Sequence, residues 1–304
     1  MLATLIGLGH EAEGFNNISD ALTEHNLNWG VELRPTFYRK ADGQLGQIKD
    51  GFAVVRTDTD AVLGRVGSDY TPLENSKALA HADRLIEIGA ASLDAVFELK
   101  GGRKVGASLR LNEDLTVAGE DPHALYITMI TSHDGSTATM TNVTPIRLWC
   151  TNQLSLSFRN ARHAWSVRHL SKIEDQLALV RSELEYVTTY KEEFEKTGET
   201  LVLTKMSERE MRMIAEAALS FVASEDSKKK SVDSIIETWN TSALIGDDYR
   251  NTAWGALNAV TEWVDHKRNY RSAEAKYTVI TSGFGARVRN NALSALLEVA
   301  GAAA

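Results

Sequence analysis

The sequence predicts an α+β fold: a curved antiparallel sheet of β-hairpins with a packed helix, followed by a mainly helical C-terminal segment. Gly101-Gly102 separates two runs of alternating character, as a two-residue hairpin turn requires. Two runs rich in β-branched residues, 125–130 and 137–143, flank His133-Asp134-Gly135. Beyond residue 172, apolar residues recur at three- or four-residue spacing. We therefore expect an α+β core domain at 1–171 and a helical segment at 172–304, packed on the core or extending from it.

Shorter runs complete the strand-rich half. Residues 28–38 alternate loosely and lead into the turn residues Ala41-Asp42-Gly43, which predicts a hairpin or loop. Residues 52–56 and 62–66 form a further candidate pair of strands. These runs add a candidate hairpin or loop and a candidate pair of strands to the two hairpins described above.

Helices are indicated by apolar spacing and by capping residues. A helix is expected over 73–88, with Asn75 as its N-cap and Gly89 at its C-terminal end. Ser207 followed by Glu210 resembles a capping box. Further helices are expected at about 230–243, 251–266 and 286–301.

Composition restricts the class of protein. The chain has 304 residues, a formal net charge of −8, 43% hydrophobic residues and one cysteine, Cys150. One cysteine excludes an internal disulfide and a cysteine-based zinc site. We find neither an apolar run that could span a membrane nor a basic N-terminal region typical of a secretory signal. The expected location is therefore the cytoplasm.

One stretch reverses the sign of the charge. Between Asp134 and Glu174 there is no Asp or Glu. Cations and aromatic residues fill this acid-free stretch, and those of interest are Arg147, Arg159, Arg162, Trp165, Arg168 and Lys172. Such a mixture fits a polyanion with stackable faces, of which single-stranded nucleic acid is the commonest. The alternative interpretation is a set of solvated strand rims, and a tryptophan in a strand often belongs to the core.

The Gly-Gly turn adds two cations, because Arg103 and Lys104 follow it and would project from the hairpin. If Arg147 and the four cations after it each contact a phosphate, log K against log salt has a slope of roughly −3.5, at about −0.7 per phosphate of a single strand. Trp165 is the best candidate for stacking on a base.

No pattern for catalysis or for cofactor binding is evident. The sequence lacks a G-x-S-x-G run, a phosphate-binding glycine loop of either standard spacing, and a closely spaced set of metal ligands. His163 and His169 lack a third ligand, and His133-Asp134 suits a hairpin turn. We therefore expect no catalytic residue, no cofactor and no metal, although an enzyme with an unfamiliar site stays open.

Five runs in order resemble the phage/plasmid-like protein family, which carries a domain of unknown function. The resemblance covers about residues 60–270, and its runs are 67–75, 101–105, 131–136, 143–155 and 251–261. It implies an origin in a phage, prophage or plasmid, and a host-cell cytoplasm, but supplies no catalytic residue. The architecture is also similar to that of the RecT/Redβ type of single-strand annealing proteins, which have a hairpin sheet backed by a helix.

Together these features predict a non-enzymatic protein that binds or anneals single-stranded DNA in phage recombination or replication. The similarity to annealing proteins implies a homo-oligomer, either a ring or a filament, and possible contact with a phage or host replication protein. The alternative is a phage protein-binding module that inhibits or modulates a host protein. In that case the cations would contact an acidic partner.

Overall fold

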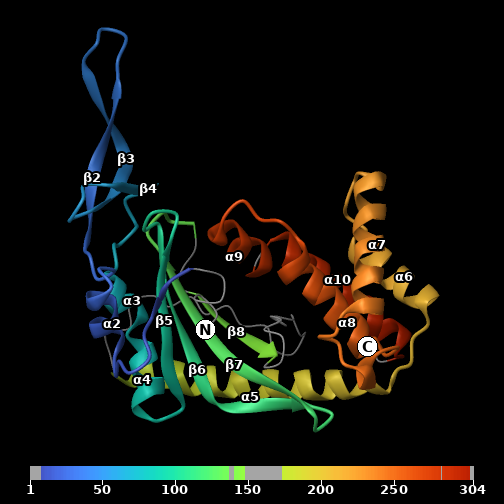
Figure 1. Ribbon diagram of the computed structural model, residues 1–304. Coiled ribbons are helices and arrows are strands. Elements are labelled where there is room, and N and C mark those ends of the chain that lie inside the picture. Colours follow the sequence, from blue (N-terminus) through green and yellow to red (C-terminus); the bar gives the residue numbers. More distant parts are fainter. Residues whose placement is uncertain (1–7, 137–139, 148–172, 282, 302–304) are drawn as a thin grey trace. The chain divides into compact units, whose positions relative to one another are not determined.

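The computed structural model describes residues 8–136, 140–147, 173–281 and 283–301, and within them no side chain is described for Met140, Arg147 or 173–181 (Figure 1). Two compact units divide the chain. Unit 1 comprises Met1–Asn112, Tyr126–Asn142 and His163–Leu184, and unit 2 comprises Glu113–Leu125, Val143–Arg162 and Glu185–Ala304.

Antiparallel strands form two sheets. The larger sheet has the order β1-β5-β6-β7-β8, and the smaller one has the order β2-β3-β4. The bounds are β1 His10–Glu11, β2 Val31–Arg39, β3 Leu45–Arg56, β4 Val62–Val66, β5 Ala91–Leu99, β6 Lys104–Val117, β7 Asp121–Ser132 and β8 Met140–Arg147. The larger sheet is open and is followed along the chain by a helical C-terminal segment. This confirms the α+β class.

The helices begin with three short ones, α2 Ile18–Glu24, α3 Asn75–Leu79 and α4 His81–Glu87. A long helix follows β8, α5 Ile173–Leu203. The remaining helices are α6 Glu208–Ala218, α7 Glu225–Thr241, α8 Ala253–Glu262, α9 Ala273–Thr281 and α10 Phe284–Val299, with a 3₁₀ turn at Asp247–Tyr249 and a π-helical turn at Trp263–Lys267. No described helix has the length and apolar character needed to cross a membrane.

The hairpins predicted from turn residues are confirmed. β5 and β6 pair in antiparallel register with Leu99 opposite Lys104, so the hairpin is present, but its loop has four residues, 100–103, and not the two expected from Gly101-Gly102. β2 and β3 pair around the turn at 41–43, with Arg39 opposite Leu45. β3 pairs with β4, and β7 lies next to β8 as the second hairpin requires.

The helix expected over 73–88 is two helices, α3 and α4, separated at Ala80. Gly89 ends α4 with a φ of 71°, and its N–H donates to Ile86 while the N–H of Ala90 donates to Leu85. This pair of bonds is a Schellman motif, so Gly89 ends the helix as the sequence predicts. The expected cap at Asn75 was wrong, because Glu74 is the N-cap residue and Asn75 is fully buried.

Unit 2 has its core around α8. Every residue from Ala253 to Glu262 is buried, and α7 and α10 both pack against this helix. Trp254 donates its indole N–H to Asp121 at 2.9 Å and lies edge-on to Phe194 of α5. In the same unit, a Cβ at Gly198 would lie only 2.6 Å from Val117, so α5 lies close to the end of β6. The predicted capping box at Ser207 and Glu210 is present on α6.

Candidate nucleic-acid interface

The β5–β6 turn brings two of the predicted cations to the surface of unit 1. Lys100, Gly101 and Gly102 all have positive φ, at 55°, 63° and 85°. This conformation suits glycine and reverses the chain within a few residues. Arg103 is exposed directly after the turn, and Lys104 begins β6 and is half-buried.

The turn is attached to the segment that follows β7. The backbone N–H of His133 donates to the carbonyl of Arg103 at 2.8 Å. The hydroxyl of Tyr70 donates to the carbonyl of Ser132 at 3.3 Å. Three of the runs that carry the family resemblance, 67–75, 101–105 and 131–136, therefore meet at one junction.

His133 forms the buried centre of this junction. Its side chain lies 2.6 Å from the Asn75 oxygen through Nε2, and the Asn75 amide nitrogen donates to the carbonyl of Leu27 at 2.7 Å. Because the carbonyl of Leu27 fixes the orientation of the amide, the Asn75 oxygen faces His133 and Nε2 carries the proton. Desolvation lowers the pKa of His133 to about 4. The imidazole is therefore neutral at physiological pH and supports the turn without offering a positive charge to a phosphate.

Trp29 closes the junction from the other side. Its ring centroid lies 5.0 Å from that of His133, and the Arg56 guanidinium lies 4.2 Å above the indole. A Cβ at Gly102 would lie 2.9 Å from the Trp29 ring and 3.1 Å from Arg56. Position 102 thus requires glycine both for its backbone conformation and for this close approach.

The charge of Arg56 is neutralised within unit 1. Its Nε and one terminal nitrogen donate to the two oxygens of Asp58 at 3.0 and 2.8 Å, and its other terminal nitrogen lies 3.5 Å from Glu98. A bidentate pair of this kind occupies the face of the guanidinium that would otherwise bind a phosphate. Arg56 is therefore a structural cation.

The cations at the turn differ in how far they are compensated. Burial would raise the pKa of Asp134, but hydrogen bonds from Ser136 and the nearby charge of Lys104 lower it overall. Lys104 therefore lies close to a carboxylate that stays ionised. Arg103 forms no ion pair with any residue that the structure describes, so its guanidinium faces solvent. Among the described residues of the junction, Arg103 is thus a cation without an ion pair, carried on a rigid support.

The side chains of the remaining predicted site residues lie outside the described part of the chain. Arg147 is the last residue of β8, and its side chain is outside the described part of the chain. The rest of the predicted set also lies outside the described residues, namely Arg159, Arg162, Trp165, Arg168 and Lys172. The convergence of these cations on one groove stays a prediction.

Sequence reasoning missed the residues that support the turn. Trp29, Arg56 and Asn75 were assigned no part in the site, and His133 was assigned to a turn. Their identity as polar or aromatic residues next to strand ends is visible in the sequence, but their meeting depends on contacts between residues 48 and 58 positions apart. Pattern analysis over short windows does not detect such contacts.

A second buried polar cluster in unit 1 connects α4, β8 and α5. Glu183 accepts a hydrogen bond from Thr141 at 3.1 Å, and its carboxylate lies 3.4 Å from Nε2 of His81. All three side chains are almost completely buried. A buried carboxylate of this kind needs its partners to stay in place, so the cluster fixes the helix against the strand.

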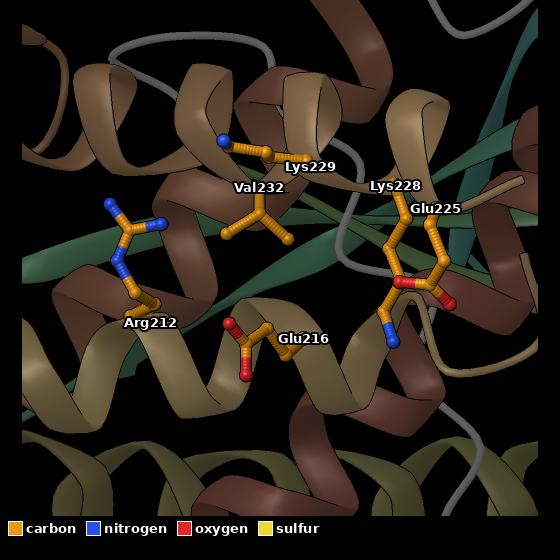
Figure 2. A pocket seen from close by; sticks show the side chains of 6 residues that line it. All are labelled: Arg212, Glu216, Glu225, Lys228, Lys229 and Val232. Atoms are coloured by element: carbon orange, nitrogen blue, oxygen red, sulfur yellow. The ribbon is translucent and has the colours of Figure 1, made fainter.

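Unit 2 has a surface pocket of about 390 Å³ between α6 and α7, shown in Figure 2. Its lining mixes cations with carboxylates, as Arg212, Glu216, Glu225, Lys228 and Lys229 surround Val232. Arg212 is paired with Asp233 at 2.9 Å.

Within the described ranges, no group of three His, Cys, Asp or Glu side chains is arranged to hold a metal ion.

Comparison with known families shows where the chain belongs. A family model described as a domain of unknown function, DUF932, matches residues 62–282. The chain belongs to the DUF932 family. No curated protein and no solved structure matches the chain.

The DUF932 match covers only part of the junction. It includes β4, the β5–β6 turn and His133, but it begins after Trp29 and Arg56. The strands β2 and β3 also precede it. In this DUF932 protein, the aromatic and cationic side of the junction is therefore supplied by the segment before the matched domain.

Proposed function

We propose that this DUF932 protein binds single-stranded DNA through cations carried by unit 1, as a non-enzymatic binding or annealing protein of phage recombination or replication. The observation that supports the proposal is Arg103, a solvent-facing cation without an ion pair in the described chain, on a turn that a buried network holds in place. A phosphate contact from a rigid turn costs less ordering of the backbone than one from a mobile loop.

The order of the elements adds support. β5, β6, β7 and β8 follow one another in the sheet, and the long helix α5 is the next described element of the chain. This order agrees with the hairpin sheet and helix of single-strand annealing proteins. By the same analogy, we propose a ring or filament of identical subunits in the host cytoplasm.

The proposal is tested by charge reversal at the turn. Arg103→Glu combined with Lys104→Glu is titrated with a fluorescently labelled oligonucleotide at several salt concentrations. Loss of two phosphate contacts reduces the magnitude of the salt slope by about 1.4 and weakens binding at low salt. The matched control is Lys228→Glu with Lys229→Glu on α7, which reverses one half-buried and one exposed charge in unit 2, as the turn variant does in unit 1.

If the turn variant and its control bind the oligonucleotide with equal affinity, the turn is not part of the binding site. The predicted groove has its own test, because Arg162→Glu with Arg168→Glu should abolish binding of the strand while circular dichroism stays unchanged. Mass photometry with and without the oligonucleotide determines whether identical subunits assemble on the strand. A protein that ignores oligonucleotides altogether would favour the alternative, a module that binds another protein.

A further inference from the structure

The distal part of the β2–β3 hairpin projects as a ribbon of two strands. β4 pairs with Phe52, Ala53, Val54 and Val55 of β3, whereas residues 45–47 pair only with residues 37–39 of β2. Between Thr36 and Lys49, only Gly46 is buried, and every other residue is exposed or half-exposed. We call residues 36–49 the arm; Figure 1 shows it as the continuation of β2 and β3 past β4.

The arm carries two of the largest exposed aromatic surfaces of the described chain. The exposed fractions of Phe37 and Tyr38 are 55% and 53%, and that of Leu45 is 67%. Adjacent residues of a strand point to opposite faces, so Phe37 and Tyr38 lie on different sides of the ribbon. Each face of the arm therefore presents one aromatic ring to solvent.

Each ring has a cation beside it. Arg39 shares the face of Phe37, since it lies two residues further along the strand, opposite Leu45. Tyr38 lies opposite Gly46, and a Cβ at that glycine would come within 2.8 Å of the Tyr38 ring and 3.0 Å of the Lys40 side chain. Gly46 thus leaves room for Tyr38 and Lys40 to lie together across the ribbon.

The cations of the arm are not neutralised within the described chain. Arg39, Lys40 and Lys49 form no ion pair with a described residue, while Arg34 at the base pairs with Glu32 and Asp60. The only carboxylate of the arm, Asp42, accepts a hydrogen bond from the backbone N–H of Gln44 in the turn. Three cations and one carboxylate give the arm a net charge of +2 in a chain of net charge −8.

These features select a ligand. A purely apolar partner would leave the three cations without a counter-charge, and a duplex hides the faces of its bases within the stack. A single strand of nucleic acid offers phosphates for the cations and unstacked base faces for the rings, and each face of the ribbon carries a ring beside a cation. An acidic protein would also complement the charge of the arm, but it has few stackable faces, so the exposed rings favour the single strand.

We propose that the arm is a second binding element for single-stranded nucleic acid, in which Phe37 and Tyr38 stack on bases while Arg39, Lys40 and Lys49 contact phosphates. This inference rests on the proposed function, because it assigns to the same ligand a contact that lies outside the DUF932 match. The arm captures the strand, and the turn at Arg103 holds its backbone.

Stacking is tested with Phe37→Ala and Tyr38→Ala, made singly and together. Each lost stack should weaken binding of a single strand roughly 5- to 150-fold. An oligonucleotide with 2-aminopurine in place of adenine gives a second measurement, since quenching of its fluorescence on binding should disappear in the double variant. The matched control is Ile88→Ala, which removes a side chain that is 57% exposed elsewhere in unit 1.

The charge contribution is tested with Arg39→Gln, Lys40→Gln and Lys49→Gln together. Loss of three phosphate contacts should reduce the magnitude of the salt slope by about 2. The control is the triple replacement of Lys228, Lys229 and Lys230 by Gln, which removes the same number of charges from α7. Single strands of DNA and RNA with the same sequence show which of the two nucleic acids the arm prefers. Affinity for a blunt duplex should be the same in both triple variants.

The outcomes separate the two proposals. If the wild-type protein binds a single strand, the Arg103→Glu and Lys104→Glu double variant loses affinity and the arm variants match their controls, then the arm inference is overturned while the proposed function stands. If the arm variants lose affinity and quenching beyond their controls, the inference is supported. If the wild-type protein binds neither DNA nor RNA, the proposed function and the arm inference both fail.

Discussion

Two hairpin ends of unit 1 differ in packing: the β5–β6 turn is packed against buried side chains, and the arm is exposed to solvent. The β5–β6 turn is held by a buried histidine, a buried asparagine and a tryptophan, whereas the arm formed by β2 and β3 has no buried side chain beyond its glycine. A turn that is packed on one side keeps its geometry when a ligand leaves. A two-stranded ribbon without a hydrophobic face adapts to its ligand, since such ribbons are only marginally stable alone.

Under the proposed function, this contrast gives the two hairpins different parts. The turn would fix where the nucleic-acid strand lies, because Arg103 starts from a defined position. The arm would capture the nucleic-acid strand, because its rings and cations are accessible from both faces. The following variants break or sharpen this contrast, beginning with the largest expected effect.

The largest effect is expected at Trp29, which is 6% exposed and contacts His133 and Arg56. Trp29→Ala should reduce the free energy of unfolding by about 3–5 kcal/mol, because it leaves a cavity beneath the β5–β6 turn. The measurement is urea denaturation followed by circular dichroism. Trp29→Phe retains part of the ring and should recover part of the loss. A loss below 1 kcal/mol for the alanine variant would show that the turn does not depend on this packing.

The pH dependence of stability tests the buried histidine. The pKa of His133 is about 4 in the folded chain, below the ordinary value of 6.5. As the pH falls, His133 is protonated in the unfolded chain before it is protonated in the folded chain. The contribution of the neutral His133 to the free energy of unfolding is therefore complete above pH 6.5 and is lost as the pH falls toward 4. At 1.36 kcal/mol per unit of pKa, the loss is roughly 3 kcal/mol.

The matched variant is His133→Gln, which keeps a donor for Asn75 but does not titrate. Its free energy of unfolding should vary less with pH between 6.5 and 4 than that of the wild-type protein. Two parallel pH profiles would contradict a neutral, buried imidazole at the junction.

A pair of glycines isolates the packing at the turn from the backbone conformation. Gly102 and Gly43 both have a φ of 85°, but only a Cβ at Gly102 would meet Trp29 and Arg56, while a Cβ at Gly43 has open space. Both alanine variants have the cost of a left-handed backbone, on the order of 1 kcal/mol. Gly102→Ala should lose a further 1–3 kcal/mol, typical of overpacking. Equal losses in urea denaturation would remove the distinction between the packed turn and the free arm.

The same contrast explains how much of the molecule could be predicted from the sequence. Gly89 and the box formed by Ser207 and Glu210 act through neighbours a few residues away, and they were predicted correctly. Gly101-Gly102 predicted the β5–β6 hairpin but not its four-residue loop. Asn75 was predicted as a cap because its local spacing fits one, but its amide binds Leu27 and His133 instead. Distant partners decided that position.

The candidate site follows the same division. Arg103 and Lys104 were predicted to project from the β5–β6 hairpin, because cations directly after a tight turn do so whatever the rest of the fold does. The support beneath them, which includes Trp29 and Arg56, requires β3 and β5–β6 to meet in space. Exposure of the arm also depends on where β4 ends along β3, and no local pattern specifies that point.

The smallest effect on stability is expected at the arm itself. Phe37→Ala and Tyr38→Ala remove side chains that are more than half exposed, so each should change the free energy of unfolding by at most about 0.5 kcal/mol. Urea denaturation at low and high protein concentration measures this change. A loss of several kcal/mol that grows with concentration would show that the rings pack against a second copy of the chain. In that case the arm would be an interface between copies of the chain. Its rings would then be packed, and exposure to solvent would no longer distinguish the arm from the turn.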